Sequence, residues 1–488
     1  MIFNLLVKMS TNIIKHKLSF DPLLGIYIGL YAFLCLPFIG LIPYFDGNID
    51  FVKSYDFFTG GFARLFQEWA SVHPPLKEFI TFPLFSLFGI NRYIYTLPWL
   101  FFGILGIISL FSFVKTVSNI KTARIASFLL ATSPLYLSVG IFGLTDFLLA
   151  IFIIAAITQY VKKQYLWYSF FASLAILTKE TAIIFCLTVL FVELIVSILL
   201  LIRKKHQAKN YLYHLILIFS PFVVFFLWII FLKTSGKPLW SDWNFSETAN
   251  RGSLYTIFNN LFRFKFFNKY TYQNWLHLFV LNFNWFWWLL TFIGFSFLFI
   301  KKRSHLKSTL LVLTQKTKAF LIVIIFIPFY LVTALSFQTY TITRYVLPLI
   351  PFLIIGVSIS SDTLIKIFPK TRLLLFTTIS LVIVLSLFFS VDPFSKHLWG
   401  ITLIQKHPFY ALHKKLAGND GLTYNMQYLF LAKERTKKIM EANNSFGPVV
   451  SQECRWIFPD PNNDKKTINI LHLKLPLNKL CINQNEQF

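Results

Sequence analysis

Charged residues are scarce in this sequence. Only 14% of its 488 residues are charged, whereas 56% are hydrophobic. So little charge cannot cover the surface of a globular domain, which excludes an ordinary soluble protein. Acidic residues are the scarcest, with 20 Asp and Glu against 46 Lys and Arg and a formal net charge of +26. The basic residues fall in short clusters between apolar runs, as in the cytoplasmic loops of a polytopic membrane protein, so no nucleic-acid partner is expected.

Cysteine is also rare, and its spacing gives no sign of a metal site. Cys35 and Cys186 fall inside apolar runs, whereas Cys454 and Cys481 fall in the polar C-terminal part. In an oxidising compartment the last two could pair and add about 3 kcal/mol of stability, or they could remain thiols. The first twenty residues lack the small-residue cleavage site of a signal peptide, which predicts an uncleaved cytoplasmic tail.

Long apolar runs dominate the rest of the chain. A helix needs about 20 apolar residues to cross a hydrocarbon core of about 30 Å, and lipid leaves a lone segment no other way to satisfy its backbone. This rule predicts about eleven spans, at residues 22–43, 93–114, 123–141, 143–161, 164–178, 181–202, 211–232, 276–300, 319–337, 343–361 and 373–391. The run at 76–90 is omitted because it is too short.

The loop charges support that omission. With the N-terminus inside, the basic clusters all face the cytoplasm, as the positive-inside rule requires: Lys115/Lys121/Arg124, Lys162/Lys163, "RKKHQAK" at 203–209, "KKRSHLK" at 301–307 and Lys366/Lys370/Arg372. A span at 76–90 would turn these clusters outward. The stretch "HPPLKEF", beginning at His73, is therefore predicted to start a helix at the outer interface.

The resulting prediction is an all-α, multi-pass integral protein of the cytoplasmic (plasma) membrane, with a transmembrane domain over 1–391. Outer loops are expected at 44–92 and 233–275. The tail, 392–488, combines turn-rich pieces with a helical-looking segment, which predicts a small soluble α+β domain on the extracytoplasmic side.

Two carboxylates follow the first span directly, Asp46 and Asp50 in "YFDGNIDF". A carboxylate partly withdrawn from water is a better proton acceptor, as a general base needs. An ordinary Asp-Gly turn at a helix end explains the same residues without chemistry.

Further ionisable residues lie at the predicted outer ends of spans. Burying an ionisable group at membrane depth costs at least about 2.5 kcal/mol at the helix centre, so such groups usually mark function. His73 precedes Pro74-Pro75, Lys179 and Glu180 interrupt "LAILTKETAIIF", Asp146 opens a span in "FGLTDFLLA", and Arg344 opens another in "TRYVLPLIP". Lys and Arg suit phosphate oxygens. Each residue also has a structural interpretation, as a helix breaker, a tight turn, an interfacial anchor or a packing group.

Taken in order, these stretches resemble the GT-C glycosyltransferases, in particular the group with protein O-mannosyltransferases and the aminoarabinose transferase that acts on lipid A. The resemblance covers roughly 22–361 and rests on "YFDGN", "HPPLKEFITFPLFSLFG", "FGLTDFLLAIFIIAA", "LAILTKETA" and "TRYVLPLIP".

The resemblance implies an inverting transfer of a sugar from a polyprenyl-phosphate donor to a hydroxyl of a protein, lipid or glycan. It implies Asp46 as the base. Many relatives have Asp-Glu where this chain has Asp46-Gly47, so the second acid could be Asp50 or Glu68, or the acceptor could differ. The lipid-phosphate site would include His73, Asp146, Lys179, Glu180 and Arg344. Such a donor needs no Gly-rich nucleotide loop, and none is evident. The cofactor is not identified, and a divalent cation remains open.

Other classes fit parts of the pattern. A transporter or flippase for a lipid-linked or anionic solute would bring charges nearer the membrane midplane and often repeated halves. A ligase for a lipid-linked glycan precursor shares the substrate and the location. A third alternative is a membrane scaffold for an outer-surface complex. That function would not explain why the buried charges all lie on one side of the membrane.

Overall fold

The computed structural model describes residues 21–41, 73–89, 92–202, 208–235, 283–302, 314–337 and 343–388, with single residues in 50–61, 259–263 and 426–437. In the tail it also describes the backbone of 454–460 and 463–473. Asp46 lies outside these residues, as do Glu68, Cys481 and most of the three large outer segments predicted from the sequence.

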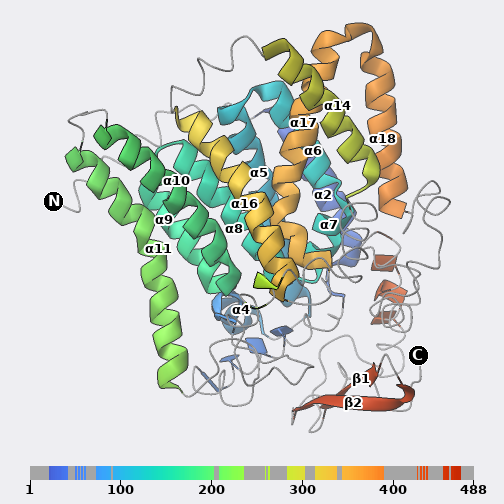
Figure 1. Ribbon diagram of the computed structural model, residues 1–488. Helices are drawn as coiled ribbons and strands as arrows, with labels where there is room; N and C mark the ends of the chain where they lie inside the picture. Colours follow the sequence, from blue (N-terminus) through green and yellow to red (C-terminus); the bar gives the residue numbers. More distant parts are fainter. Residues whose placement is uncertain are drawn as a thin grey trace.

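The described chain is a bundle of helices (Figure 1). In chain order the elements are α2 (Pro22–Cys35), η1 (Leu36–Phe38), α4 (Leu76–Phe88), α5 (Arg92–Val117), α6 (Ile120–Ala131), α7 (Pro134–Ile141), α8 (Thr145–Val161), α9 (Tyr165–Thr178), η2 (Glu180–Ala182), α10 (Ile183–Ile202), α11 (Ala208–Thr234), α14 (Trp285–Lys302), α16 (Gln315–Phe337), η6 (Thr343–Leu349), α17 (Ile350–Ile367), η7 (Pro369–Thr371), α18 (Arg372–Phe388), β1 (Cys454–Asp460) and β2 (Asn463–Leu473).

A helix lies in each of the predicted spans. Within the described residues, six helices are long and apolar enough to cross a membrane, or seven if α6 and α7, bent by 53° at Pro134, count as one span. Four shorter apolar helices occupy the other predicted ranges: Pro22–Phe38, Thr145–Val161, Tyr165–Thr178 and Trp285–Leu298. The chain is an integral multi-pass membrane protein. The number of eleven membrane spans remains a prediction.

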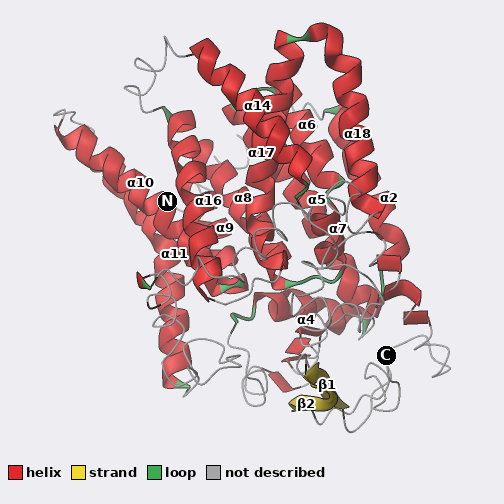
Figure 2. Cartoon of the chain, turned by 45° about the vertical axis from the view of Figure 1, so that its right-hand side comes forward, coloured by secondary structure: helices red, strands yellow, loops and turns green. Residues whose placement is uncertain are grey.

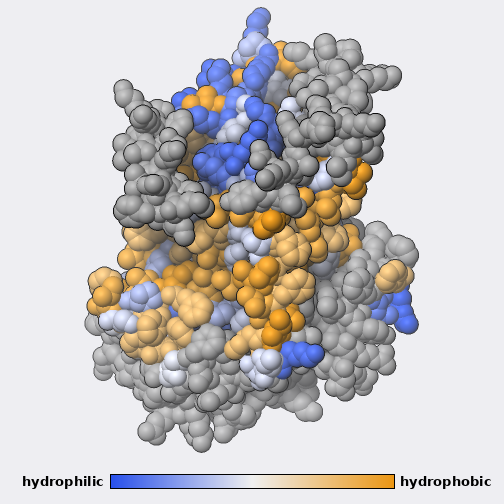
Figure 3. Space-filling model, turned by 90° about the vertical axis from the view of Figure 1, so that its left-hand side faces the viewer, coloured by the Kyte–Doolittle hydropathy of each residue, from blue (hydrophilic) through white to orange (hydrophobic). Residues whose placement is uncertain are grey.

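An apolar band crosses the face of the bundle that Figure 3 shows. The space-filling view shows hydrophobic residues across the middle of the molecule and hydrophilic ones gathered toward its upper end. Large apolar side chains such as Phe33, Phe101, Phe292 and Leu373 are exposed on the helices. Exposed apolar surface on this scale is expected where lipid, and not water, is the surrounding medium.

Helix α8 forms the centre of the bundle. Its residues are apolar all round, so no side of it is suited to water, and 15 of its 17 residues are buried. Neighbouring helices approach closely where glycine leaves room for an aromatic ring. A Cβ at Gly143, whose φ is 58°, would overlap the indole of Trp99. This turn leads directly into Asp146 at the start of α8 and so fixes the position of that carboxylate.

Within the described residues, the ends of the helices that carry predicted basic residues lie opposite the ends that carry the candidate site residues. α8 begins beside Asp146 and ends before Lys162, and α17 begins after Arg344 and ends beside Lys366. A helix of 17 residues is about 25 Å long, which separates the two groups by most of a membrane. Which end faces the cytoplasm remains a prediction.

Helix α4 confirms the predicted helix after Pro75. It has 13 residues and is not among the span candidates of the described chain. Both cartoon views show it at one end of the bundle (Figure 1 and Figure 2). His73, just before it, contacts Glu180 at the break after α9, and the neighbouring Lys179 contacts Asp146 at the start of α8. Its charged residues Lys77 and Glu78 are buried, whereas Leu87 and Phe88 are exposed. A helix with charges turned inward and apolar groups outward fits a position at the membrane interface, which remains a prediction.

The tail contains an antiparallel hairpin of β1 and β2, with Cys454 opposite Leu473. The described residues between 426 and 437 are helical, and one of them, Phe430, packs edge-on against Phe38 at 5.2 Å between ring centroids. These pieces are compatible with the predicted α+β domain, which itself remains a prediction.

Candidate functional site

Charged side chains from several separate segments are buried together at the end of the bundle that holds α4. They come from the first loop, the start of α4, the start of α8, the break between α9 and η2, and η6. The sequence-predicted candidates fall into three groups of contacts there: Asp50 with Lys77, His73 with Glu180, and Asp146 with Lys179 and Arg344.

Asp146 lies between two cations. Its Oδ1 is 2.7 Å from Nζ of Lys179, and its Oδ2 is 3.3 Å from Nε of Arg344. The Asp146 side chain is 1% exposed and both cations are 9% exposed. The ring of Tyr345 adds a cation–π contact, with its centroid 4.4 Å from the Lys179 ammonium. Burial opposes the charge of Lys179, but the Asp146 carboxylate and Tyr345 outweigh it and raise the pKa of Lys179 above its usual value.

A break in the helix directs Lys179 and Glu180 to different partners. α9 ends at Thr178, Lys179 adopts an extended conformation with φ of −157°, and η2 begins at Glu180. Neighbouring side chains diverge in extended backbone. Lys179 therefore reaches Asp146, while Glu180 reaches His73, whose Nδ1 is 2.8 Å from Oε2 of Glu180. The sequence offered two interpretations of Lys179 and Glu180, a tight turn between helices or part of a functional site. The break is compatible with both.

The start of α4 holds a second set of ion pairs. Nζ of Lys77 is 2.7 Å from Oδ2 of Asp50, and Nζ of Lys53 is 3.5 Å from Oε1 of Glu78. Burial lowers the pKa of Lys77, and the Asp50 carboxylate offsets part of that shift. Lys53 and Glu78 were not predicted as site residues.

Aromatic rings complete this second set. The Lys77 ammonium lies 5.4 Å from the ring centroid of Tyr95 and 5.3 Å from that of Trp99. Both rings are fully buried on α5. Such cation–π contacts partly replace the water that a buried ammonium has lost. The adjacent Lys77 and Glu78 within a short apolar helix were the sequence signal for these contacts.

Pairing changes the roles that these carboxylates can play. Asp50, Glu78, Asp146 and Glu180 each have a cationic side chain within 3.5 Å, with His73 counted as the partner of Glu180. A carboxylate oxygen that already accepts a hydrogen bond from a buried ammonium is less accessible to the hydroxyl of a substrate. Asp50 is therefore placed to hold Lys77 and not to act as an unhindered base.

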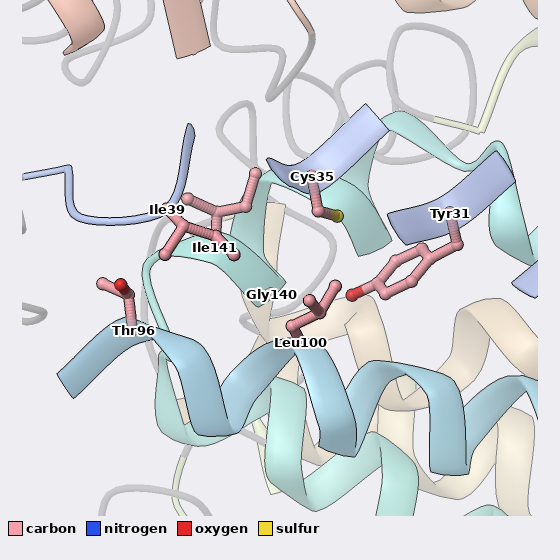
Figure 4. A pocket seen from close by; sticks show the side chains of 7 residues that line it. All are labelled: Tyr31, Cys35, Ile39, Thr96, Leu100, Gly140 and Ile141. Atoms are coloured by element: carbon pink, nitrogen blue, oxygen red, sulfur yellow. The ribbon is translucent and has the colours of Figure 1, made fainter. Parts of the chain in front are cut away.

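The cavity in Figure 4 is too small for a substrate. It lies between α2, α5 and α7, where Tyr31, Cys35, Thr96 and Leu100 line a volume of about 10 Å³. A cavity of this size holds one water molecule at most. Among the residues that the structure describes, no three His, Cys, Asp or Glu side chains gather as metal ligands would.

Comparison with known proteins gives one family match, over about a third of this chain. Residues 72–228 match the family model of the dolichyl-phosphate-mannose-protein mannosyltransferases. The resemblance to the GT-C glycosyltransferases is confirmed. The matched segment of the GT-C pattern contains His73, Asp146, Lys179 and Glu180, whereas Asp46, Asp50 and Arg344 lie outside it. A comparison with curated protein sequences gives no match.

Two solved structures resemble the GT-C-like chain at low sequence identity. ArnT from Cupriavidus metallidurans bound to undecaprenyl phosphate has 15% identity and a TM-score of 0.47, over 86% of this chain and 78% of that chain. AglB, the oligosaccharyltransferase from Archaeoglobus fulgidus, in complex with an inhibitory peptide and a dolichol-phosphate, has 11% identity and a TM-score of 0.49, over 92% of this chain and 61% of that chain.

Proposed function

We propose that this GT-C glycosyltransferase moves a sugar from a polyprenyl-phosphate donor to an acceptor hydroxyl, with inversion at the sugar carbon. The acceptor class, a protein, lipid or glycan, remains open. The proposal rests above all on the Asp146 cluster, in which two buried cations lie side by side around one carboxylate. Undecaprenyl and dolichol phosphates are bound by the structural neighbours named above, which is in keeping with this donor class.

The donor phosphate would bind at Lys179 and Arg344. A guanidinium presents a fixed fork of N–H donors to phosphate oxygens, and an ammonium adds a compact charge. Both groups are withdrawn from water, which strengthens their attraction for an anion. As the bond between the sugar and the phosphate breaks, negative charge grows on the departing phosphate. Cations that are already in place stabilise that charge without reorganising.

The acceptor hydroxyl must lose a proton in the same step. Its oxygen forms the new bond to the sugar carbon, the electron pair of the old bond leaves with the polyprenyl phosphate, and the proton passes to a base. The family resemblance assigns this role to Asp46, which lies outside the described residues. Asp50 could take the proton only by giving up its contact with Lys77, so we assign it the supporting role of holding that lysine.

A release assay tests this function. The purified protein is incubated with a panel of polyprenyl-phosphate sugars and an acceptor extract, and free polyprenyl phosphate is measured. We expect release with at least one donor, and loss of release in Asp46→Asn. Asp362→Asn is the matched control, because Asp362 lies at the opposite end of the bundle beside Lys366. An Asp46→Asn variant as active as the control would overturn the base assignment, and no release with any donor would overturn the transferase.

One buried ion pair bears on the transporter alternative. Glu193 on α10 is 1% exposed and contacts Lys318 on α16 at 2.9 Å, with a hydrogen bond from Tyr160 on α8. Ionisable groups inside a helical bundle can mark a solute or proton path. Flipping of a fluorescent polyprenyl-phosphate sugar in vesicles, lost in Glu193→Gln, would support that function. The same pair also ties three helices together, which is the role we assign to it.

A further inference from the structure

We propose that Tyr345 is a positioning residue of the donor phosphate site, and that its ring holds the two cations of the Asp146 cluster in place without neutralising them. The proposal rests on the proposed function, because it concerns the site assigned to the donor phosphate. Two distances carry it. The ring centroid of Tyr345 lies 4.4 Å from Nζ of Lys179 and 5.3 Å from Cζ of Arg344.

Two cations share one carboxylate in this cluster. Lys179 and Arg344 both contact Asp146, and each cationic side chain is only 9% exposed. Little water is therefore present to screen the repulsion between the two cations, and charges act more strongly on one another where water is scarce. A partner that attracts both cations at once reduces the cost of keeping them together.

An aromatic ring is such a partner, and it differs from a second carboxylate in one respect. The π face of the ring is negative, so it attracts a cation that lies over it, but the ring carries no net charge. A second carboxylate at this position, together with Asp146, would balance the charges of Lys179 and Arg344 completely. The ring stabilises the two cations and leaves one positive charge available to a phosphate.

The ring joins two segments that are distant in the chain. Tyr345 follows Arg344 directly in η6, whereas Lys179 comes from the break between α9 and η2. Tyr345 is half-buried, whereas the two cations and Asp146 are buried. The ring is therefore the member of the cluster that is most accessible from outside, beside the cations that an arriving phosphate would meet.

The alternative role is an interfacial anchor, in which Tyr345 only packs at the membrane boundary, as tyrosines often do there. The two roles respond differently to fluorine on the ring. Fluorine withdraws electrons from the π face and weakens its attraction for a cation, while the ring keeps nearly the same size. An anchor should tolerate a fluorinated ring, whereas a ring that holds cations should fail in steps as fluorines are added.

The test is binding of undecaprenyl phosphate to the full-length protein in phosphatidylcholine nanodiscs. Tyr345→Phe keeps the ring, so its affinity should stay within about twofold of the wild type. Phenylalanines with one, two and three ring fluorines at position 345 should bind progressively more weakly. Tyr345→Leu should lose about tenfold in affinity, because the phosphate must then order both cations itself.

Phe111 provides the matched control. Its ring centroid lies 5.9 Å from Nζ of Lys115 in the last turn of α5, so the same fluorinated rings at position 111 should leave binding unchanged. The Lys179→Ala background provides a second control, because the ring has lost one of its cations there. The loss of affinity caused by Tyr345→Leu should be smaller in this background than in the wild type.

Fluorinated rings that bind as well as phenylalanine would overturn the role of the ring. So would a Tyr345→Phe variant that binds as weakly as Tyr345→Leu, since the hydroxyl would then be the important group. Failure of the proposed function gives a different result. Stepwise loss of binding in a protein without sugar transfer would reject the transferase and keep the role of the ring, whereas transfer with binding indifferent to fluorine would reject that role alone.

Discussion

Replacing Asp146 by Asn tests the central cluster most directly. The amide keeps the size of the side chain but removes its charge, so Lys179 and Arg344 would face each other across a buried site. Asp146 is 1% exposed and each cation 9%, so water cannot take over the lost interaction. Breaking a buried ion pair costs about 3–5 kcal/mol, and here one carboxylate serves two partners. We therefore expect a loss of stability of at least about 3 kcal/mol.

The assay is thermal unfolding of the purified protein in detergent, followed by tryptophan fluorescence. Asp362→Asn is the matched control, because Asp362 also holds a lysine, but the side chain of Lys366 is 58% exposed and can return to water. Asp146→Asn should melt well below this control. Undecaprenyl phosphate should raise the melting temperature of Asp146→Asn by more than that of the control, since in Asp146→Asn it also supplies the missing negative charge. Equal melting of the two variants, or equal rescue, would refute the reasoning.

Three further predictions concern the phosphate site, the sidedness and the bundle core. Lys179→Ala and Arg344→Ala should each weaken binding of undecaprenyl phosphate by about tenfold, since a hydrogen bond to a charged group is worth about 1.5–3 kcal/mol; unchanged affinity in both would remove their assigned role. Ser86→Cys and Lys163→Cys, in a background without native cysteines, should react with an impermeant maleimide from opposite sides of the membrane, and reaction from one side would contradict the eleven-span topology. Glu193→Gln should lower the melting temperature and leave undecaprenyl phosphate binding intact, whereas weaker binding would place this pair in the functional site.

The positions of the helices could be predicted from the sequence. So could the fact that the candidate site residues share one end of the bundle. Apolar run length locates a membrane helix, and the loop charges set its direction, so Asp146, Lys179 and Arg344 could be assigned to one end without a structure. The contacts between them could not be assigned. Lys179 and Asp146 are 33 positions apart, and their meeting depends on how α8 and α9 pack.

Two buried ion pairs, Lys53–Glu78 and Glu193–Lys318, were not predicted from the sequence, for different reasons. Lys53 lies in a helical stretch of the predicted outer loop and Glu78 in the 13-residue helix α4. Neither stretch has a periodic sequence pattern that fixes which side chains turn inward. Glu193 had a signal, since it is a lone acid within the apolar run "FVELIV". A single carboxylate in a span requires a partner, and a search for a lysine near the end of a later span would have suggested Lys318.

The ion pairs also determine how a phosphate could enter the site. It could displace Asp146 or bind beside it. Displacement would expose a carboxylate that is 1% exposed and fixed at the first turn of α8 by the Gly143 turn, and would leave that carboxylate without a partner. Addition avoids this cost. A polyprenyl phosphodiester carries one negative charge, so together with Asp146 it balances the charges of Lys179 and Arg344. Asp146 therefore holds the two cations apart and in place, and the donor phosphate supplies the second negative charge.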